Sequence, residues 1–164
     1  MKLSIRPYVP EDAGSLTDIF YDSIHAIGSE SYSAAQRQAW APQPKDYGYW
    51  QQRLNQKPPF VAEVEGQIVG FMTLEANGHI DWTYTHKDFQ RRGIASALYA
   101  YLESAARTQR IESLWVEASL LAKPFFAKRG FHVVRQNDTK RLGEILINYT
   151  MEKSLKKAKG ESAP

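Results

Sequence analysis

The chain of 164 residues contains no cysteine. This absence excludes disulfide bonds, thiolate metal sites and a cysteine nucleophile. No run of about twenty apolar residues is present, so we predict no membrane-spanning segment. Residues 1–7 also lack the apolar core of a secretory signal peptide. We therefore expect a complete, cytoplasmic protein.

A strong excess of one charge is also absent. The chain carries 21 Lys and Arg against 18 Asp and Glu, a net charge of +3, and residues 152–161 hold four lysines and only two glutamates. The remainder is therefore close to neutral, and we expect no nucleic acid as a partner. With 43% hydrophobic and 24% charged residues, we predict one globular domain over 1–155 and a flexible basic tail over 156–164.

Two common phosphate-binding motifs are missing as well. The chain has no G-x-x-x-x-G-K-[ST] loop and no G-x-G-x-x-G followed by an acidic residue. These absences argue against a P-loop nucleotidase and against a Rossmann dinucleotide site.

Hydrophobic periodicity predicts alternating helices and strands. Strands are expected at 3–6, 60–64, 68–74, 79–85, 113–118, 131–134 and 145–151. Helices are expected around Leu16 to Ile27, from Ser33 to Trp40, around Tyr49 to Leu54, and at 94–108 and 121–129. This order predicts a mixed α/β domain in which crossover helices make part of the sheet parallel.

The segment with the clearest chemistry is Gln90-Arg91-Arg92-Gly93-Ile94-Ala95-Ser96, which follows a predicted strand and opens a predicted helix. The first amides of a helix have no internal partner and carry partial positive charge. Gly93 and Ala95 leave room for a phosphate group to approach these amides. From these residues alone, the segment is either a phosphate cradle or a basic helix start without a ligand.

Four segments together resemble the GNAT superfamily of acetyl-CoA-dependent N-acetyltransferases. Gln90-x-x-Gly93-x-Ala95 is similar to that family's Q/R-x-x-G-x-G/A motif, and residues 80–90 to the strand and loop before it. Ala122-x-x-Phe125-Phe126-x-x-x-Gly130-Phe131 and the segment 148–153 resemble the family's following helix and last strand. The resemblance spans 3–155, and residues 31–42 resemble a branch of uncharacterised bacterial members.

The resemblance implies a fold and a cofactor. We expect a mixed sheet of six to seven strands, flanked by helices and splayed between the fourth and fifth strands. Acetyl-CoA is the implied cofactor, without a metal. The implied cofactor-binding residues are Thr83, Tyr84, Thr85, Gln90, Arg91, Arg92, Gly93, Ile94, Ala95, Ser96, Ser119, Phe125 and Phe126.

The sequence departs from the family pattern at Phe126, where many members carry a tyrosine whose hydroxyl protonates the leaving thiolate. Phenylalanine cannot donate that proton, so we expect Phe126 to pack against the cofactor. Another acid then serves, or the thiolate leaves unassisted. A thiol pKa of about 8.5 makes thiolate a fair leaving group.

The candidates for acid, base and acceptor binding come from the strands beside the splay and from the N-terminal half. By alternation, we expect His79, Asp81, Thr83 and Thr85 to share one face of their strand. Glu117 is the first candidate base, Asp81 the second and His79 the third. Tyr149 and Tyr84 are the candidate acids. Tyr32 and Trp40, from a region also containing Tyr47, Tyr49 and Trp50, either line an acceptor pocket or form a helical core.

We therefore predict an N-acetyltransferase that moves an acetyl group directly from acetyl-CoA to a primary amine of a small molecule or peptide. Two alternatives stay open: a non-catalytic acyl-CoA sensor and a toxin-like acetyltransferase of aminoacyl-tRNA. The low charge of the domain argues against the second. No membrane partner is expected, and a homodimer is possible.

Overall fold

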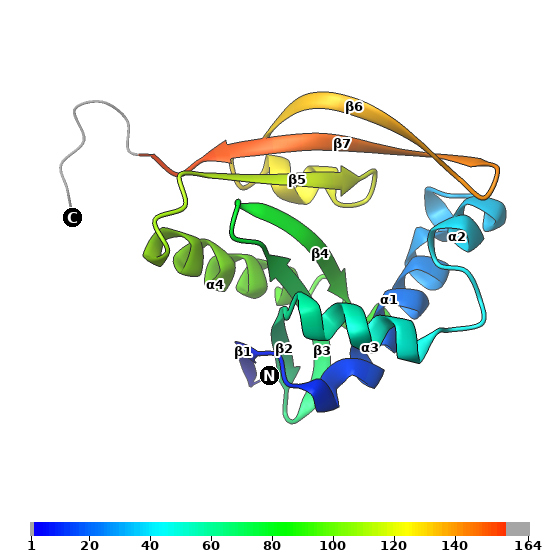
Figure 1. The fold of residues 1–164 in the computed structure, drawn as a ribbon, viewed down its shortest axis with the longest axis horizontal. Helices are drawn as coiled ribbons and strands as arrows, with labels where there is room; N and C mark the ends of the chain where they lie inside the picture. The colour runs from blue at the N-terminus through cyan, green and yellow to red at the C-terminus, as the bar shows by residue number, and fades with distance from the viewer. Residues whose placement is uncertain (1, 157–164) are drawn as a thin grey trace.

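The computed structural model describes residues 2–156, apart from the side chains of residues 27 and 28. Its centre is one seven-stranded sheet with the order β1-β2-β3-β4-β5-β7-β6 (Figure 1). The strands are β1 (Leu3–Pro7), β2 (Phe60–Val64), β3 (Gln67–Leu74), β4 (His79–Thr85), β5 (Ser113–Ser119), β6 (His132–Arg141) and β7 (Glu144–Ser154). Beyond Lys156, the predicted tail lies outside the described residues.

Within residues 2–156, five α-helices and three short 3-10 helices connect the strands. The α-helices are α1 (Ala13–Ile27), α2 (Ala34–Trp40), α3 (Tyr47–Gln56), α4 (Ile94–Thr108) and α5 (Lys123–Ala127). The 3-10 helices are η1 (Pro10–Asp12), η2 (Gly28–Glu30) and η3 (Lys87–Phe89). In the described part of the chain, none of the helices has the length and apolar character needed to cross a lipid bilayer.

The helices form two hydrophobic layers with the sheet. One core cluster joins α4 and α5 to the sheet and includes Leu98, Leu102 and Phe126. The other joins α1 and α3 to the sheet and includes Leu16 and Trp50. Each cluster buries the apolar stripe of an amphipathic helix against apolar strand residues, which explains why these helices form where the periodicity predicts them.

The sheet opens between its fourth and fifth strands. The parallel pair β4 and β5 shares register at His79↔Trp115 and Ile80↔Val116, and no further pair is formed within residues 2–156. Beyond these pairs the two strands diverge (Figure 1). β5 instead pairs along its whole length with β7. The predicted mixed α/β fold, its strand number and its splay are thus confirmed.

Several predicted boundaries are wrong. The helix expected at 121–129 is only Lys123–Ala127, because the chain turns at Leu120–Ala122 before the helix begins at Lys123, with Pro124 in its first turn. The strand expected at 131–134 runs as far as Arg141. Its residues 135–141 are polar and, apart from the half-buried Asn137, exposed. They therefore show no apolar alternation, and backbone pairing with β7 is what makes them a strand.

A bulge overturns the expected alternation along β4. Thr83 pairs with Met72, whereas Ile80 pairs with Leu74, so β4 holds one extra residue between these pairs. Because paired residues lie on the same face of a sheet, Thr83 lies on the face of Ile80 and not on the face of His79. The prediction that His79, Asp81, Thr83 and Thr85 share one face is therefore wrong.

Candidate active site

A cavity of about 240 Å³ lies where β4 and β5 separate, bordered also by α1, α2 and α5. It brings together many of the predicted site residues. Those in its lining are Trp40, Asp81, Thr83, Tyr84, Thr85, Gln90, Ala95, Glu117, Ser119, Phe125 and Phe126. The other predicted residues, Tyr32, Arg91, Arg92, Gly93, Ile94, Ser96 and Tyr149, are not in that lining.

The loop before α4 presents backbone rather than side chains. Gly93 is the N-cap of α4, with φ of 78°, and makes no capping bond through a side chain. A Cβ built on Gly93 would meet no atom within 4 Å, so the space beside it is open. Gln90 Nε2 donates to the carbonyl oxygens of Thr85 at 3.0 Å and His86 at 3.2 Å, which ties the loop to the end of β4. The start of α4 is therefore a fixed, open group of amides suited to an anion.

The arginines of this loop do not enter the cavity lining. The guanidinium of Arg92 lies over the ring of Phe89, 5.1 Å from its centroid. Arg91 adopts a left-handed backbone with φ of 60°. Ile94 is buried in the core, so only its backbone faces the loop. The start of α4 itself supplies partial positive charge at this end of the cavity.

The end of β4 has a free backbone edge. Thr83, Tyr84 and Thr85 pair with β3 on one side, while β5 has already diverged on the other. The Thr83 Oγ1 atom is buried and lacks a hydrogen-bond partner among the described residues. An extended ligand with amide groups could therefore pair along this edge as an added strand does.

Aromatic rings close the α5 side of the cavity. Phe126 is fully buried and packs at right angles to Phe125, with ring centroids 5.1 Å apart. Arg129, which the sequence reasoning did not single out, lies 3.6 Å from the centroid of Phe125 and donates to Ser96 Oγ. Burial lowers the pKa of Arg129. This arginine links α5 to the first turn of α4.

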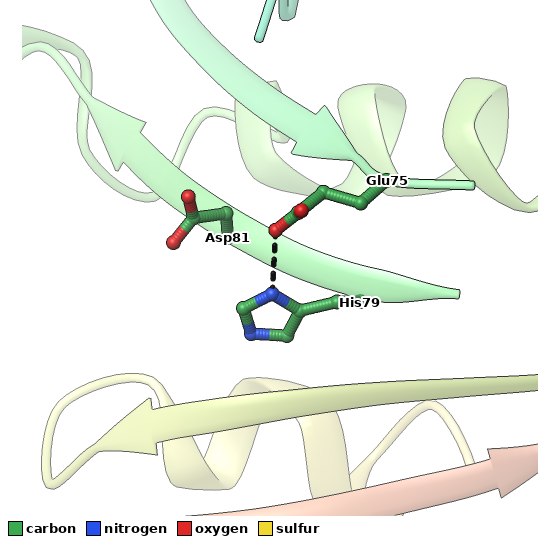
Figure 2. A group of neighbouring side chains, drawn as sticks. All are labelled: Glu75, His79 and Asp81. Carbon is green, nitrogen blue, oxygen red and sulfur yellow. Dashed lines mark hydrogen bonds and ion pairs between the residues drawn. The ribbon is translucent and has the colours of Figure 1, made fainter. Parts of the chain in front are cut away.

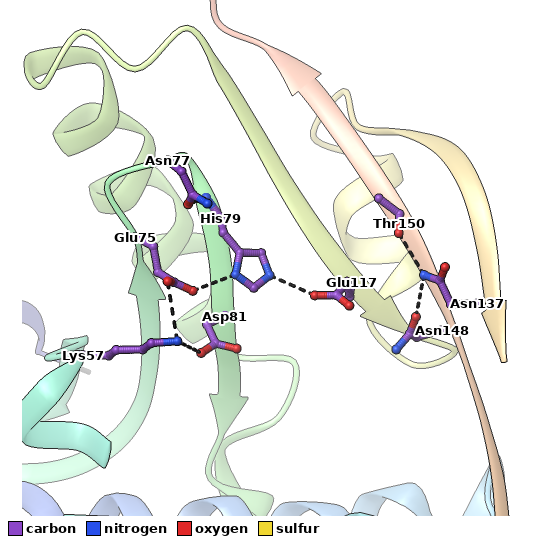
Figure 3. Close-up of polar contacts among 9 residues, drawn as sticks. All are labelled: Lys57, Glu75, Asn77, His79, Asp81, Glu117, Asn137, Asn148 and Thr150. Carbon is purple, nitrogen blue, oxygen red and sulfur yellow. Dashed lines mark hydrogen bonds and ion pairs between the residues drawn. The ribbon is translucent and has the colours of Figure 1, made fainter. Parts of the chain in front are cut away.

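A network of side chains crosses the splay between β4 and β5, on the sheet face opposite α5 (Figure 3). His79 Nδ1 lies 2.7 Å from Glu75 Oε1, and His79 Nε2 lies 3.1 Å from Glu117 Oε1. Lys57 Nζ lies 3.5 Å from Glu75 Oε2 and 3.4 Å from Asp81 Oδ2. Burial alone would raise the pKa of Glu75, but the hydrogen bond with His79 and the charge of Lys57 lower it below its usual value. The network joins Glu75, which lies outside the cavity lining, to Asp81 and Glu117, which lie in it.

Three members of this network could in principle hold a metal ion. One ligand atom each from Glu75, His79 and Asp81 lie within 4.8 Å of one another (Figure 2). The ammonium group of Lys57, however, already lies beside the carboxylates of Glu75 and Asp81. A metal ion at this position would be repelled by that charge, so the arrangement favours an ion-pair network.

The tyrosine candidates have different surroundings. Tyr84 lines the cavity and packs against Phe20, and burial raises the pKa of its hydroxyl above the usual value. Tyr149 lies outside the cavity lining, and Lys123 Nζ stands over its ring at 4.1 Å. A raised pKa makes Tyr84 a weak acid, and the position of Tyr149 does not bring its hydroxyl to the cavity. We therefore carry neither tyrosine forward as the acid.

The N-terminal aromatics divide between core and cavity. Tyr32 is buried, and its hydroxyl accepts a hydrogen bond from Leu120 N at 2.9 Å. Its ring packs at right angles to Trp40, which lines the cavity. Trp50 is buried in the α1–α3 core, whereas Tyr47 and Tyr49 are exposed. Trp40 is thus the aromatic residue of this region that faces the cavity, and Tyr32 supports it.

Sequence reasoning missed Glu75 and Lys57. Both lie just beyond the ends of regular elements, Glu75 after β3 and Lys57 at the C-cap of α3. Neither belongs to a motif. Only the turn at residues 75–78, which pairs Glu75 N with His79 O at 2.8 Å, hints that Glu75 and His79 are neighbours.

Comparisons with known proteins agree with this geometry. A family model described as an acetyltransferase (GNAT) domain matches residues 29–153. The chain is 34% identical over 149 residues to an uncharacterised N-acetyltransferase, YafP, of Escherichia coli strain K12, which covers 91% of this chain and 94% of that protein.

Solved structures show the same fold. A GCN5-related N-acetyltransferase from Rhodopseudomonas palustris is 37% identical, with a TM-score of 0.88 over 94% of this chain and 97% of that one. The PaiA N-acetyltransferase of Thermoplasma acidophilum, solved in complex with coenzyme A, is 18% identical, with a TM-score of 0.73 over 94% and 99% of the two chains. The splayed sheet, the open loop before α4 and these likenesses agree: the chain belongs to the GNAT acetyltransferase family and is an N-acetyltransferase.

Proposed function

We propose that the protein transfers the acetyl group of acetyl-CoA directly to a primary amine that enters the cavity at the splay. One observation carries this proposal: Ala95 in the first turn of α4 and the free edge of β4 border the same cavity as Glu117 and Asp81. The acceptor is a small molecule or a peptide that carries a primary amine.

The residues present fit the cofactor. The open space beside Gly93 suits a diphosphate group, and the free edge of Thr83–Thr85 suits the amides of a pantetheine arm. Thr83 Oγ1 supplies a buried hydroxyl with no protein partner among residues 2–156. Ser119 adds a second short polar side chain to the lining. Bound acetyl-CoA supplies an activated acetyl thioester.

The reaction needs a neutral amine. A lysine-type amine with a pKa of about 10.4 is neutral in about one molecule in 2,500 at pH 7. Deprotonating the amine at this pH therefore costs about 4.6 kcal/mol of free energy. Glu117 and Asp81 both line the cavity and could accept the amine's proton. Glu117 has a half-exposed side chain and a neighbouring imidazole, whereas Asp81 lies beside Lys57. This difference favours Glu117 over Asp81 as the base.

The leaving thiolate cannot take a proton from residue 126, because the tyrosine of many family members is a phenylalanine here. Phe126 lines the cavity, and it is fully buried. We infer that the thiolate leaves without a side-chain acid, which its low basicity permits. Phe126 instead packs against the thioester end of the cofactor.

The acceptor enters past α1 and α2. Ser23, Ile24 and Trp40 form this side of the cavity lining. Trp40 offers an aromatic face to a cationic or apolar acceptor, and Tyr32 holds Trp40 from behind. We propose both as acceptor-site residues, with Trp40 in contact and Tyr32 in support.

Two measurements test the proposal. Acetyl-CoA should raise the melting temperature, by an amount that grows with the ratio of its concentration to its Kd. Thiol release should then be followed on a panel of diamines, amino acids and peptides. No thermal shift with acetyl-CoA, CoA or other acyl-CoAs would rule out the cofactor; a shift without thiol release on any amine would instead indicate a binding protein.

A further inference from the structure

We propose that Glu75, His79 and Glu117 act together as the proton acceptor of the reaction, with Glu75 as the residue that positions His79. This inference rests on the proposed function and deepens it. It assigns a role to Glu75, which lies outside the cavity lining, and turns two separate candidate bases into one unit.

The geometry fixes the imidazole from three sides. Its ring stacks on Trp115 with centroids 4.0 Å apart and planes at 27°. Glu75 Oε1 accepts from Nδ1 at 2.7 Å, and Glu117 Oε1 lies 3.1 Å from Nε2. The backbone N–H of His79 donates to Asn77 Oδ1 at 3.0 Å. The ring is therefore held with one nitrogen toward each carboxylate.

Counting protons shows what this arrangement does. A carboxylate at Glu75 only accepts, so the short bond at Nδ1 requires the hydrogen to lie on Nδ1. In neutral His79 the lone pair of Nε2 then faces Glu117 Oε1, which is also an acceptor. The two lone pairs repel until one proton enters between them, and that proton completes both hydrogen bonds. The Nε2–Oε1 pair is thus built to bind one proton.

The charged surroundings favour capture of that proton. The charged groups facing His79 are Glu75, Asp81 and Glu117, with Lys57 as their counter-ion. Three carboxylates against one ammonium attract a cationic amine to this site. His79 is largely shielded, whereas the Glu117 side chain is 48% exposed. The amine can therefore reach Glu117, and the imidazole holds the proton away from it.

The proton balance is as follows. An ammonium acceptor gives one proton to Glu117, where it is shared with His79 Nε2. The amine nitrogen then forms a bond to the acetyl carbon, and the carbon–sulfur bond breaks. The second nitrogen proton goes to the departing thiolate, giving CoA thiol and the amide. The first proton leaves to solvent from the Glu117–His79 pair.

The kinetic test uses His79→Gln and Glu75→Gln, with an amine from the panel that releases thiol. In His79→Gln, Glu117 Oε1 loses the neighbouring Nε2 lone pair with which it shares the proton, so kcat should fall at least about tenfold. Its acid limb should also move to lower pH, because a carboxylate alone binds a proton more weakly. The kcat of Glu75→Gln should fall by a similar factor. The amide of the substituted side chain can donate a hydrogen bond to Nδ1 of His79, and the ring hydrogen then lies on Nε2, where no lone pair is left to accept a proton. Glu112→Gln is the matched control, because Glu112 is exposed and pairs with Lys156.

A second readout does not depend on activity. The chain has four histidines, so the ring nitrogens of His79 can be assigned in ¹⁵N NMR spectra with His79→Gln. At alkaline pH the free protein should show His79 with hydrogen on Nδ1, and Glu75→Gln should move it to Nε2. An Nε2–H ring in the unaltered protein, or unchanged kcat and acid limb in both variants, would overturn the proposal.

The experiments distinguish failure of the joint proton acceptor from failure of the proposed acetyltransferase function. If acetyl-CoA still shifts the melting temperature and thiol release continues in both variants with the original pH profile, then only the proposal that Glu75, His79 and Glu117 act together is wrong. In that case Asp81→Asn should abolish turnover and identify Asp81 as the base. If acetyl-CoA causes no shift in the unaltered protein, the proposed function fails, whatever the tautomer of His79.

Discussion

The two ends of the cavity use different parts of the chain. At the α4 end, the binding groups are backbone amides and the free edge of one strand, within residues 83–95. At the opposite end, the polar groups are side chains from β4, β5, the turn after β3 and the end of α3. The first end depends on local backbone geometry, and the second depends on how distant segments pack. Substitutions should separate these two dependences.

The largest expected effect is on the junction that both ends share. Gly78 has φ of 89°, and its carbonyl accepts from Trp115 N at 3.0 Å where β4 and β5 begin together. A Cβ at Gly78 would overlap the carbonyl oxygen of Ser113. We expect Gly78→Ala to lower the free energy of unfolding by about 3 kcal/mol, from backbone strain plus overlap. Urea unfolding measures this.

Gly66→Ala is the matched control. Gly66 also has a positive φ, of 83°, but a Cβ there would meet nothing within 4 Å. It should lose only the strain, about 1 kcal/mol. Equal losses in the two variants would show that the β4–β5 junction is not as tight as described.

The next effect breaks the backbone end alone. Gly93→Asp places a carboxylate beside the amides that would face the diphosphate, and like charges so close cost several kcal/mol. Affinity for acetyl-CoA should fall about a hundredfold or more, as measured by calorimetry. Gly143→Asp makes the same change at a glycine with φ of 81° on the β6–β7 turn. If both variants bind acetyl-CoA equally, the loop before α4 does not hold the diphosphate.

A third substitution contrasts two charged clusters. Arg6 donates to Asp12 at 2.8 Å and to Glu63 at 2.7 Å, away from the cavity. Burial alone would raise the pKa of Asp12, but hydrogen bonds from Arg6 and from Val9 N lower it below its ordinary value of 3.8. We expect Asp12→Asn to lose about 2 kcal/mol of stability at pH 7 with acetyl-CoA affinity unchanged, whereas Glu117→Gln should lose turnover with stability unchanged.

The pH dependence of that loss has a definite sign. Because the folded-state pKa of Asp12 is lowered, its stabilisation is complete above about pH 4 and disappears as pH falls through the folded-state pKa. The stability difference between the unaltered protein and Asp12→Asn should therefore shrink in acid. A difference that stays constant from pH 7 to pH 3, in thermal unfolding, would contradict the charged role of Asp12.

The smallest effect concerns Tyr32. Tyr32→Phe removes the acceptor of the Leu120 N–H but keeps the ring against Trp40, so stability should fall by about 1 kcal/mol. KM for the acceptor should change little, because the ring still supports Trp40. Trp40→Ala is the comparison and should raise that KM. A larger KM change for Tyr32→Phe than for Trp40→Ala would place the Tyr32 hydroxyl in contact with the acceptor.

Prediction from sequence succeeded where the signal lay within a few successive residues. The helix beginning at Ile94 was expected at the residues where it forms, and its glycine N-cap was visible in the loop. β6 shows the opposite case, because its residues 135–141 carry no apolar alternation and become a strand only through pairing with β7. The cavity lining contains residues whose placement follows from local sequence signals and residues placed by the pairing of distant segments.

The sequence by itself predicted the mixed α/β fold and the loop at residues 90–96, because helix starts, glycine conformations and apolar periods are local properties. The family and the splay were implied by the resemblance of its motifs to the GNAT superfamily. Only the tertiary structure decided that Glu75, His79 and Glu117 meet. Their contact needs the turn that pairs Glu75 N with His79 O, and the two paired positions at which β4 still touches β5. Such contacts depend on the register between strands, and no short stretch of sequence encodes it.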